Sequence, residues 1–252
     1  MKITLLGTGT STGVPLIGCK CEVCSSMDSR DKRLRCSALL ETMDARILID
    51  CGPDFRAQML RAHFDRLDAV LITHEHYDHV GGIDDLRPFC EFGDIDVYAE
   101  DFCATHLEER LPYCFAEHKY PGIPNINLIR IKPHLPIVVN TTKILPIRVM
   151  HGPLPIVGFR IENMAYIIDM KTIEEEELTY LEGVEILIVN GLRHKPHTSH
   201  QTIEEAVAFA HKIGAKQTFL THLGHQAGLH AEASRFLPPD VTFGSDGQVI
   251  WA

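Results

Sequence analysis

The chain has 252 residues, 45% of them hydrophobic, which is enough to bury the core of a single domain spanning residues 1–252. The formal net charge of -10, from 34 acidic and 24 basic residues, argues against a long nucleic acid as a partner, because an acidic surface repels phosphate backbones. The sequence has neither a signal-peptide pattern at residues 1–7 nor a run of roughly 18 apolar residues, so we expect a cytoplasmic protein without a membrane partner.

The chain begins with a predicted strand over residues 1–7, which leads into a glycine-rich loop over residues 7–15. This loop lacks the lysine of a P-loop, and no amphipathic helix follows it, so we do not expect it to bind phosphate. Its glycines either let the backbone pass close to a metal site or form a structural turn.

Three cysteines, Cys19, Cys21 and Cys24, lie within six residues of one another. In a cytosolic enzyme, clustered cysteines indicate a metal more often than a disulfide, and a Cys3His zinc site is the natural completion. Reduced, unligated cysteine is the alternative. The remaining cysteines are expected to be small buried hydrophobic side chains, and they are Cys36, Cys51, Cys90, Cys103 and Cys114.

A hairpin is predicted from residues 36–42 and 45–50, with Asp50 at the end of its second strand. A helix is predicted over residues 54–63. Next comes a short, β-branched apolar run at residues 67–72, which is typical of a buried strand.

Residues 73–82 contain three imidazoles and two carboxylates directly after that strand. His74 and His76 are two residues apart and could chelate one ion, while Asp78 and His79 face a second position nearby. Nitrogen and carboxylate ligands suit Zn, Mn or Fe rather than Ca or Mg alone. The alternative is a histidine-rich surface loop, which the dense spacing disfavours.

The segment from residue 83 to about 136 is less periodic. It contains a predicted short strand at residues 96–98 and a helix at residues 101–111 that ends at Pro112. Residues 113–127 are interpreted as an irregular insert that folds over the site or makes a subunit contact, which leaves a homodimer open. Three histidines of this region are expected at the surface, and they are His106, His118 and His134.

Two strand ends in the second half carry further candidate ligands. A predicted strand over residues 143–150 ends at His151, and a predicted hairpin of residues 157–161 and 165–168 ends at Asp169. His151 could complete a three-imidazole set with the first two histidines of the earlier loop. Asp169 could bridge two ions through its two oxygens.

A helix with a capping-box pattern is predicted to begin at Thr172, and a buried strand at residues 184–189. The loop that follows contains His194, His197 and His200, the last directly before a predicted amphipathic helix.

A strand at residues 217–220 leads to His222 and, three residues later, to His225, the candidate fourth ligand of the cysteine cluster. A closing helix over residues 227–236 and two short strands complete the second half. The two βα-rich halves follow one another without a linker.

The H-x-H-x-D-H sequence of residues 74–79 resembles that of the metallo-β-lactamase superfamily, in which this loop holds a dinuclear metal centre. The resemblance implies an α/β fold, the αβ/βα four-layer sandwich. The series Gly7-Thr8-Gly9, Val14-Pro15 and Cys19-x-Cys21-x2-Cys24, coupled to His222-Leu223-Gly224-His225, is similar to the PhnP-type phosphodiesterases of phosphonate metabolism over nearly the whole chain.

The resemblance implies two catalytic divalent ions, Zn or Mn, bound by His74, His76, Asp78, His79, His151, Asp169 and His222. It implies a structural zinc bound by Cys19, Cys21, Cys24 and His225. Asp50 would stand behind the ligands and steady the histidine loop, or, alternatively, cap its own turn. His200, together with Asp78, would be catalytic, with His200 protonating the leaving alkoxide or holding the phosphoryl oxygen. His194 and His197 stay open as alternatives.

The implied function is hydrolysis of small phosphodiesters, including cyclic ribose or nucleotide phosphates, by metal-activated water. A carboxylate at Asp169, in place of the cysteine of many lactam-cleaving relatives, favours phosphoesters over lactams. The alternatives are another hydrolase of this fold, such as a PqqB-like protein or a thioester or lactone hydrolase, and a non-catalytic metal-binding protein. A tRNA-processing nuclease is disfavoured because the chain has no long basic arm and is acidic.

Overall fold

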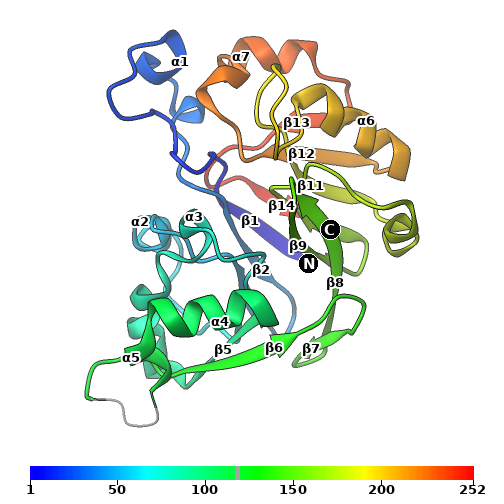
Figure 1. Ribbon diagram of the computed structural model, residues 1–252. Helices are drawn as coiled ribbons and strands as arrows, with labels where there is room; N and C mark the ends of the chain where they lie inside the picture. The colour runs from blue at the N-terminus through cyan, green and yellow to red at the C-terminus, as the bar shows by residue number, and fades with distance from the viewer. Residues whose placement is uncertain (117–119) are drawn as a thin grey trace.

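Two seven-stranded sheets face each other in the computed structural model, which describes residues 1–116 and 120–252 (Figure 1). The first sheet consists, in spatial order, of β14 (Val249–Trp251), β1 (Lys2–Gly7), β2 (Ser37–Glu41), β3 (Arg46–Ile49), β4 (Ala69–Leu71), β5 (Ile95–Glu100) and β6 (Ile126–Ile131). The second consists of β13 (Val241–Phe243), β12 (Gln217–Thr221), β11 (Ile186–Asn190), β10 (Met164–Ile167), β9 (Leu154–Ile161), β8 (Thr142–His151) and β7 (Ile137–Val139).

Helices cover the outer face of each sheet (Figure 1). On the first sheet they are α2 (Phe55–Met59), η2 (Ile83–Phe92), α4 (Asp101–Arg110) and α5 (Pro112–Phe115). On the second they are η3 (Glu175–Leu181) and α6 (Ile203–Ile213). The remaining short helices are α1 (Glu22–Ser25), η1 (Ser29–Asp31), α3 (Tyr77–Val80), η4 (His225–Ala227), α7 (His230–Ala233) and η5 (Ser234–Phe236). The predicted αβ/βα four-layer sandwich is confirmed.

The alternation of side chains along the strands builds three apolar layers. In β1, Ile3 and Leu5 point into the core between the sheets, whereas Leu6 packs in the outer layer beneath α2 and α4. Strands such as β11 are buried on both faces, which explains why their sequences are continuous apolar runs rather than alternating ones.

Strands β3 to β6 are parallel, as are β10 to β13. Parallel strands present their carboxyl ends at one edge of a sheet, where α/β proteins place their chemistry. The candidate ligands of both halves follow such strand ends, so this topology positions the site.

Several predicted helices differ in the structure. The helix predicted over residues 54–63 is only α2, because the Arg46 guanidinium takes the carbonyls of His63, Asp65 and Arg66 as hydrogen-bond acceptors. The closing helix predicted over residues 227–236 is divided into η4, α7 and η5, with Gly228 at a φ of 92° at the break.

The capping box predicted at Thr172 is wrong. Thr172 forms an isolated β-bridge with Met150, and η3 begins only at Glu175, without a side-chain cap. Bonds between the Lys171 and Thr172 N–H groups and the Met150 carbonyl tie this segment to β8, and these tertiary contacts override the local pattern.

The region 83–136 is more regular than predicted, because β5 and β6 extend the first sheet and α4 packs over them. The helix predicted over residues 101–111 is α4, which ends at Arg110, and Pro112 begins the short helix α5. His106 and His134 are at least partly exposed, while His118 lies outside the described residues. Among the described residues, no helix combines the length and apolar character needed to cross a membrane.

A true capping box begins α6. The Thr202 hydroxyl accepts from the Glu205 N–H at 3.1 Å, and the Glu205 carboxylate accepts from the Thr202 N–H at 2.8 Å. Gly214, at a φ of 74°, ends the helix in the left-handed conformation that glycine adopts without strain. The cap fixes the point where the loop of His194, His197 and His200 enters α6.

We expect Thr202→Ala to lower the free energy of unfolding by about 1 kcal/mol, because the Glu205 N–H loses its hydrogen-bond partner. Thr202→Ser keeps the hydroxyl and is the matched control, expected to stay close to the wild-type value. Urea unfolding of the metal-loaded protein measures both. Equal stability of the alanine and serine variants would contradict this role for the cap.

Candidate metal centre

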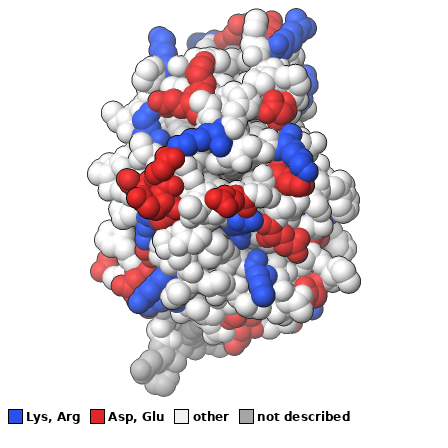
Figure 2. Space-filling model, turned by 90° about the vertical axis from the view of Figure 1, so that its right-hand side faces the viewer, with Lys and Arg blue, Asp and Glu red and all other residues white. Residues whose placement is uncertain are grey.

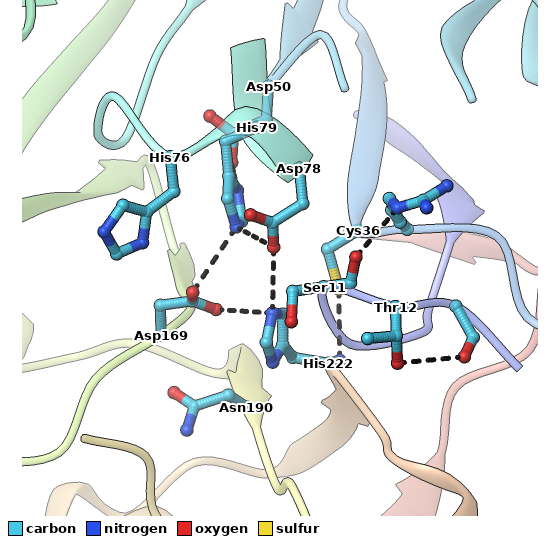
Figure 3. Close-up of polar contacts among 12 residues, drawn as sticks. Ser11, Thr12, Cys36, Asp50, His76, Asp78, His79, Asp169, Asn190 and His222 are labelled. Atoms are coloured by element: carbon cyan, nitrogen blue, oxygen red, sulfur yellow. Dashed lines mark hydrogen bonds and ion pairs between the residues drawn. The ribbon is translucent and has the colours of Figure 1, made fainter. Parts of the chain in front are cut away.

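The structure brings together the ends of five strands at one site. Asp50 follows β3, and the histidine loop of residues 73–79 follows β4. From the second sheet come His151 at the end of β8, Asp169 after β10 and His222 after β12. In Figure 3, Asp169 and His222 face Asp78 and His79 across the gap between the two halves.

The candidate ligands form two groups that share one residue. One group consists of His74, His76, His151 and Asp169, and the other of Asp78, His79, Asp169 and His222. Within each group, the donor atoms all lie within 4.8 Å of one another. The residues predicted as ligands therefore lie together, and Asp169 belongs to both groups.

Histidine nitrogens lie close to both carboxylate oxygens of Asp169. Its Oδ2 lies 3.6 Å from His74 Nε2 and 3.4 Å from His79 Nε2, and its Oδ1 lies 3.0 Å from His222 Nε2. The side chain is 2% exposed. A buried carboxylate with histidines on both oxygens is suited to bridging two cations.

Buried polar atoms without a hydrogen-bond partner indicate that the site suits a metal ion. His79 Nε2, His222 Nε2 and Asp169 Oδ1 are buried and make no hydrogen bond of good geometry. Orphaned buried polar atoms are costly, and here they converge on a common space. Imidazole nitrogen and carboxylate oxygen are the donors that Zn and Mn take, so the residues present fit divalent ions.

In three of the histidines, the ring nitrogen that faces away from the site is hydrogen-bonded to a neighbouring group. His79 Nδ1 lies 2.8 Å from Asp50 Oδ2, and His74 Nδ1 lies 3.0 Å from the Thr73 hydroxyl. His151 Nδ1 donates to the backbone carbonyl of Asp169 at 2.7 Å. Such bonds fix the tautomer and leave Nε2 free to face an ion.

Asp50 is fully buried and does more than cap a turn. Its carboxylate accepts from the Thr73 N–H at 2.8 Å and from the Thr73 hydroxyl at 2.9 Å, besides holding His79. Gly52 allows the turn after it to approach, since a Cβ there would lie 2.0 Å from the Asp78 carbonyl oxygen. The strand end and the histidine loop are thus locked together.

Three residues of the site have left-handed backbone conformations, namely Asp50, Asp169 and His222, with φ of 59°, 58° and 54°. Non-glycine residues seldom adopt this region, and it costs of order 1 kcal/mol each. Each of the three directly follows, or follows within two residues, a strand that points at the site. The strained turn redirects the side chain toward the centre.

Two supporting residues escaped the sequence analysis. Asn190 is buried and brackets the turn after Asp169, accepting from the Met170 N–H at 2.8 Å and donating to the Met170 carbonyl at 3.0 Å. Cys36, expected only as a small hydrophobic residue, accepts from the His222 N–H at 3.1 Å. A polar residue closing an apolar strand was the available signal for Asn190.

The glycine-rich loop passes beside His222. Gly9 forms β-bridges with Arg35 and Leu223, and the Leu223 N–H donates to the Thr8 carbonyl. A Cβ on Gly7 would lie 2.0 Å from the Arg35 carbonyl oxygen, so the glycines permit close backbone contact. Figure 3 shows Ser11 and Thr12 of this loop on the His222 side.

The cysteine cluster forms a separate group with His225. The donor atoms of Cys19, Cys21, Cys24 and His225 lie within 4.8 Å of one another, on the loop around α1 and on η4. Hydrogen bonds from the Cys24 N–H and from His225 lower the pKa of Cys21 to about 6, whereas burial raises that of Cys24 to about 11. Three thiols and an imidazole are the donor set of a structural zinc.

Of the three loop histidines, His200 packs against the centre. Its ring lies 4.6 Å from that of His151 and 4.9 Å from that of His222, and it is 8% exposed. The His197 ring lies 4.9 Å from that of His200, with the two planes tilted by 36°. His194 is exposed and bonds to Glu204 at 2.6 Å, away from the centre.

Comparisons with known proteins agree with this geometry. A family model described as the beta-lactamase superfamily domain matches residues 45–223. The chain is 50% identical over 250 residues to the octanoyltransferase of Porphyromonas gingivalis, and the match covers 98% of this chain but 51% of that protein. The chain thus spans about half the length of this curated relative.

Solved structures share the whole fold. The crystal structure of a diphosphatase from the PhnP family matches with a TM-score of 0.92 and 37% identity, covering 99% of this chain and 96% of that one. Zinc-bound PqqB from Methylobacterium extorquens matches with a TM-score of 0.83 at 19% identity, with both chains fully covered. The second likeness concerns the fold alone.

The charges of the centre predict how the metal-free protein responds to pH. Burial opposes protonation of His222, but the Asp169 and Asp78 carboxylates outweigh it and raise the pKa of His222 to about 9. Burial likewise opposes the Asp169 charge, and His222 and His79 outweigh it and lower the pKa of Asp169 well below its usual value.

Stabilisation by protonated His222 is complete below its unfolded pKa of 6.5 and is lost as pH rises through about 9. Stabilisation by ionised Asp169 is present above 3.8 and is lost toward acid. We therefore expect the Tm of chelator-treated protein to fall as the pH rises from 6.5 to about 9, and to fall less in His222→Gln. Identical profiles for the two proteins would contradict this coupling.

Proposed function

Since the chain belongs to the β-lactamase superfamily, in its PhnP-type branch, and is a hydrolase of the metallo-β-lactamase fold, we propose that it is a dinuclear metal-dependent phosphodiesterase. Its substrates are small phosphodiesters, including cyclic ribose or nucleotide phosphates. The observation that carries the proposal is the pair of donor groups that share the Asp169 carboxylate.

We assign His74, His76, His151 and Asp169 to one divalent ion, and Asp78, His79, Asp169 and His222 to the other, each ion being Zn or Mn. Such ions, when bound, act as Lewis acids and make water a nucleophile near neutral pH. The chain holds the donors in place through Asp50 and Asn190, so little reorganisation is needed during the reaction. Cys19, Cys21, Cys24 and His225 hold a structural zinc.

His200 is suited to contact the substrate. Burial lowers its pKa to about 3, and the neighbouring histidines reinforce this against the opposing effect of Asp169. The ring is therefore neutral at pH 7, and its buried Nδ1 has no hydrogen-bond partner. A neutral imidazole donates one hydrogen bond, so we assign His200 to holding a phosphoryl oxygen rather than to protonating the leaving alkoxide.

A small substrate suits the charge of the molecule better than a polymer. The face in Figure 2 carries Lys and Arg interspersed with Asp and Glu, with a group of carboxylates near its centre. A long nucleic acid requires a continuous basic stripe to neutralise its phosphates. The net charge of -10 opposes one, whereas a single phosphodiester needs only local positive charge at the centre.

A diphosphatase is the second candidate, favoured by the PhnP-family relative described by that name. Attack at phosphorus is common to both reactions, and the leaving group distinguishes them. Acyl transfer or thioester hydrolysis is the third candidate activity. It is suggested by the match to the octanoyltransferase, although about half of that protein lies outside the match. A panel of bis(p-nitrophenyl) phosphate, 2′,3′-cyclic AMP, ADP-ribose and an octanoyl thioester separates these activities.

We expect His76→Ala to lose bound metal and to lower turnover of the preferred phosphodiester by at least about 100-fold, because one donor group loses an imidazole. Metal analysis and initial rates with added Mn or Zn measure both effects. His211→Ala, which removes an exposed histidine paired with Asp240, is the control. Unchanged turnover in His76→Ala would refute the site.

We expect His200→Ala to lower kcat by about 100-fold with little loss of metal, because a hydrogen bond to the transition state disappears. His200→Asn retains an N–H donor and should recover part of the rate. The exposed His194→Ala is the matched control. A parallel loss of metal and activity in His200→Ala would instead make the residue structural.

A further inference from the structure

A polar cavity, separate from the candidate metal centre, lies on the outer face of the first sheet. It has a volume of about 270 Å³ and lies between α2 and the strands β14, β1 and β2. Lys2, Thr4 and Leu6 line it, whereas the alternating residues Ile3 and Leu5 belong to the core between the sheets. No residue assigned above to a metal lines this cavity.

The cavity is positively charged in a protein that is strongly acidic overall. Lys2, Arg46 and Arg61 line it, against the single carboxylate of Glu41. Glu41 bonds to Lys2 Nζ at 2.6 Å and lies 3.6 Å from Arg46 Nε. Among the described residues, the Arg61 guanidinium makes no hydrogen bond or ion pair, so its charge is available to a ligand.

Two residues that line the cavity each have a buried side-chain atom without a hydrogen-bond partner. Gln58 is 2% exposed, and its Oε1 is unpartnered while its Nε2 donates to the Arg35 carbonyl. Arg46 is 7% exposed, and its Nε makes no hydrogen bond and lies 3.6 Å from Glu41, while its other nitrogens donate to backbone carbonyls. One orphan accepts and the other donates, so a fitting ligand carries both kinds of group.

A neighbouring crevice adds to the positive field. Arg61 also borders a hollow of about 570 Å³ whose charged lining consists otherwise of Arg30, Lys32 and Arg33 and the carboxylate of Asp246. Arg30 is paired with Asp28, and the Arg33 guanidinium is engaged by Thr8. Cationic side chains therefore lie on both sides of Arg61, and their combined positive potential favours an anion beside it.

We propose that the cavity of Lys2, Arg46, Gln58 and Arg61 binds a small phosphomonoester that also carries hydroxyl groups, such as a phosphorylated sugar. The excess of two positive charges matches a phosphate dianion, and the guanidinium of Arg61 can donate two parallel hydrogen bonds to phosphate oxygens. The hydroxyl groups donate to Gln58 Oε1 and Glu41. A volume of about 270 Å³ admits a pentose phosphate but not a polymer.

The test is calorimetric titration of ribose 5-phosphate into the metal-loaded protein, with ribose and inorganic phosphate as comparison ligands. We expect ribose to bind at least about tenfold more weakly than ribose 5-phosphate, because it lacks the charged group. Arg61→Gln should weaken ribose 5-phosphate by at least about tenfold, whereas Arg235→Gln, an exposed arginine elsewhere, should not. Turnover of phosphodiester substrates should be unchanged in Arg61→Gln.

Two further pairs of variants locate the ligand. Lys2→Gln alters this cavity alone and should weaken binding, whereas Lys32→Gln alters the neighbouring crevice alone and should not. Binding should persist in His76→Ala. The proposal would be overturned if ribose 5-phosphate did not bind. It would also be overturned if binding were lost in Lys32→Gln but not in Lys2→Gln, or were lost only in His76→Ala. These outcomes measure binding, so they are independent of whether the metal centre hydrolyses phosphodiesters.

Discussion

The contact on which the rest of the structure depends is that of the buried Asp169 carboxylate with histidines from both halves of the chain. Its oxygens lie 3.4 Å from His79 Nε2 and 3.0 Å from His222 Nε2. A lone buried carboxylate would be destabilising, so the histidines, and the ions for which they are arranged, compensate the cost. The two sheets must therefore keep their relative position for the centre to exist, and the core of Phe159 and Tyr166 between them maintains it.

Rigid support extends outward from that contact in one further layer. Asp50 holds His79 and Thr73, Asn190 brackets the backbone after Asp169, and Cys36 accepts the His222 N–H. The left-handed backbone at Asp50, Asp169 and His222 costs energy, and the surrounding bonds overdetermine it. Strain of this kind gives the ligands fixed positions before any ion or substrate arrives.

The sequence identified the candidate ligands because each follows an apolar strand or belongs to one dense motif. Contiguity made the loop of residues 73–82 recognisable, and the strand ends identified His151, Asp169 and His222. Asn190 was missed because its role depends on a bond to Met170, twenty residues away, which no local pattern encodes. The false cap at Thr172 failed for the same reason, since a bridge to Met150 decides its conformation.

The segment that follows the cysteine cluster is joined to the candidate metal centre by the buried Arg33. Arg33 follows the cluster in sequence, is 6% exposed, and donates to the Thr8 hydroxyl at 2.8 Å. Thr8 belongs to the glycine-rich loop, and its carbonyl accepts from Leu223, the residue after His222. His225 of the cluster lies three residues beyond His222, so both ends of this connection reach the same ligand. The cysteine loop has few apolar contacts of its own, and these hydrogen bonds and the short segment to His225 join it to the strand end that presents His222.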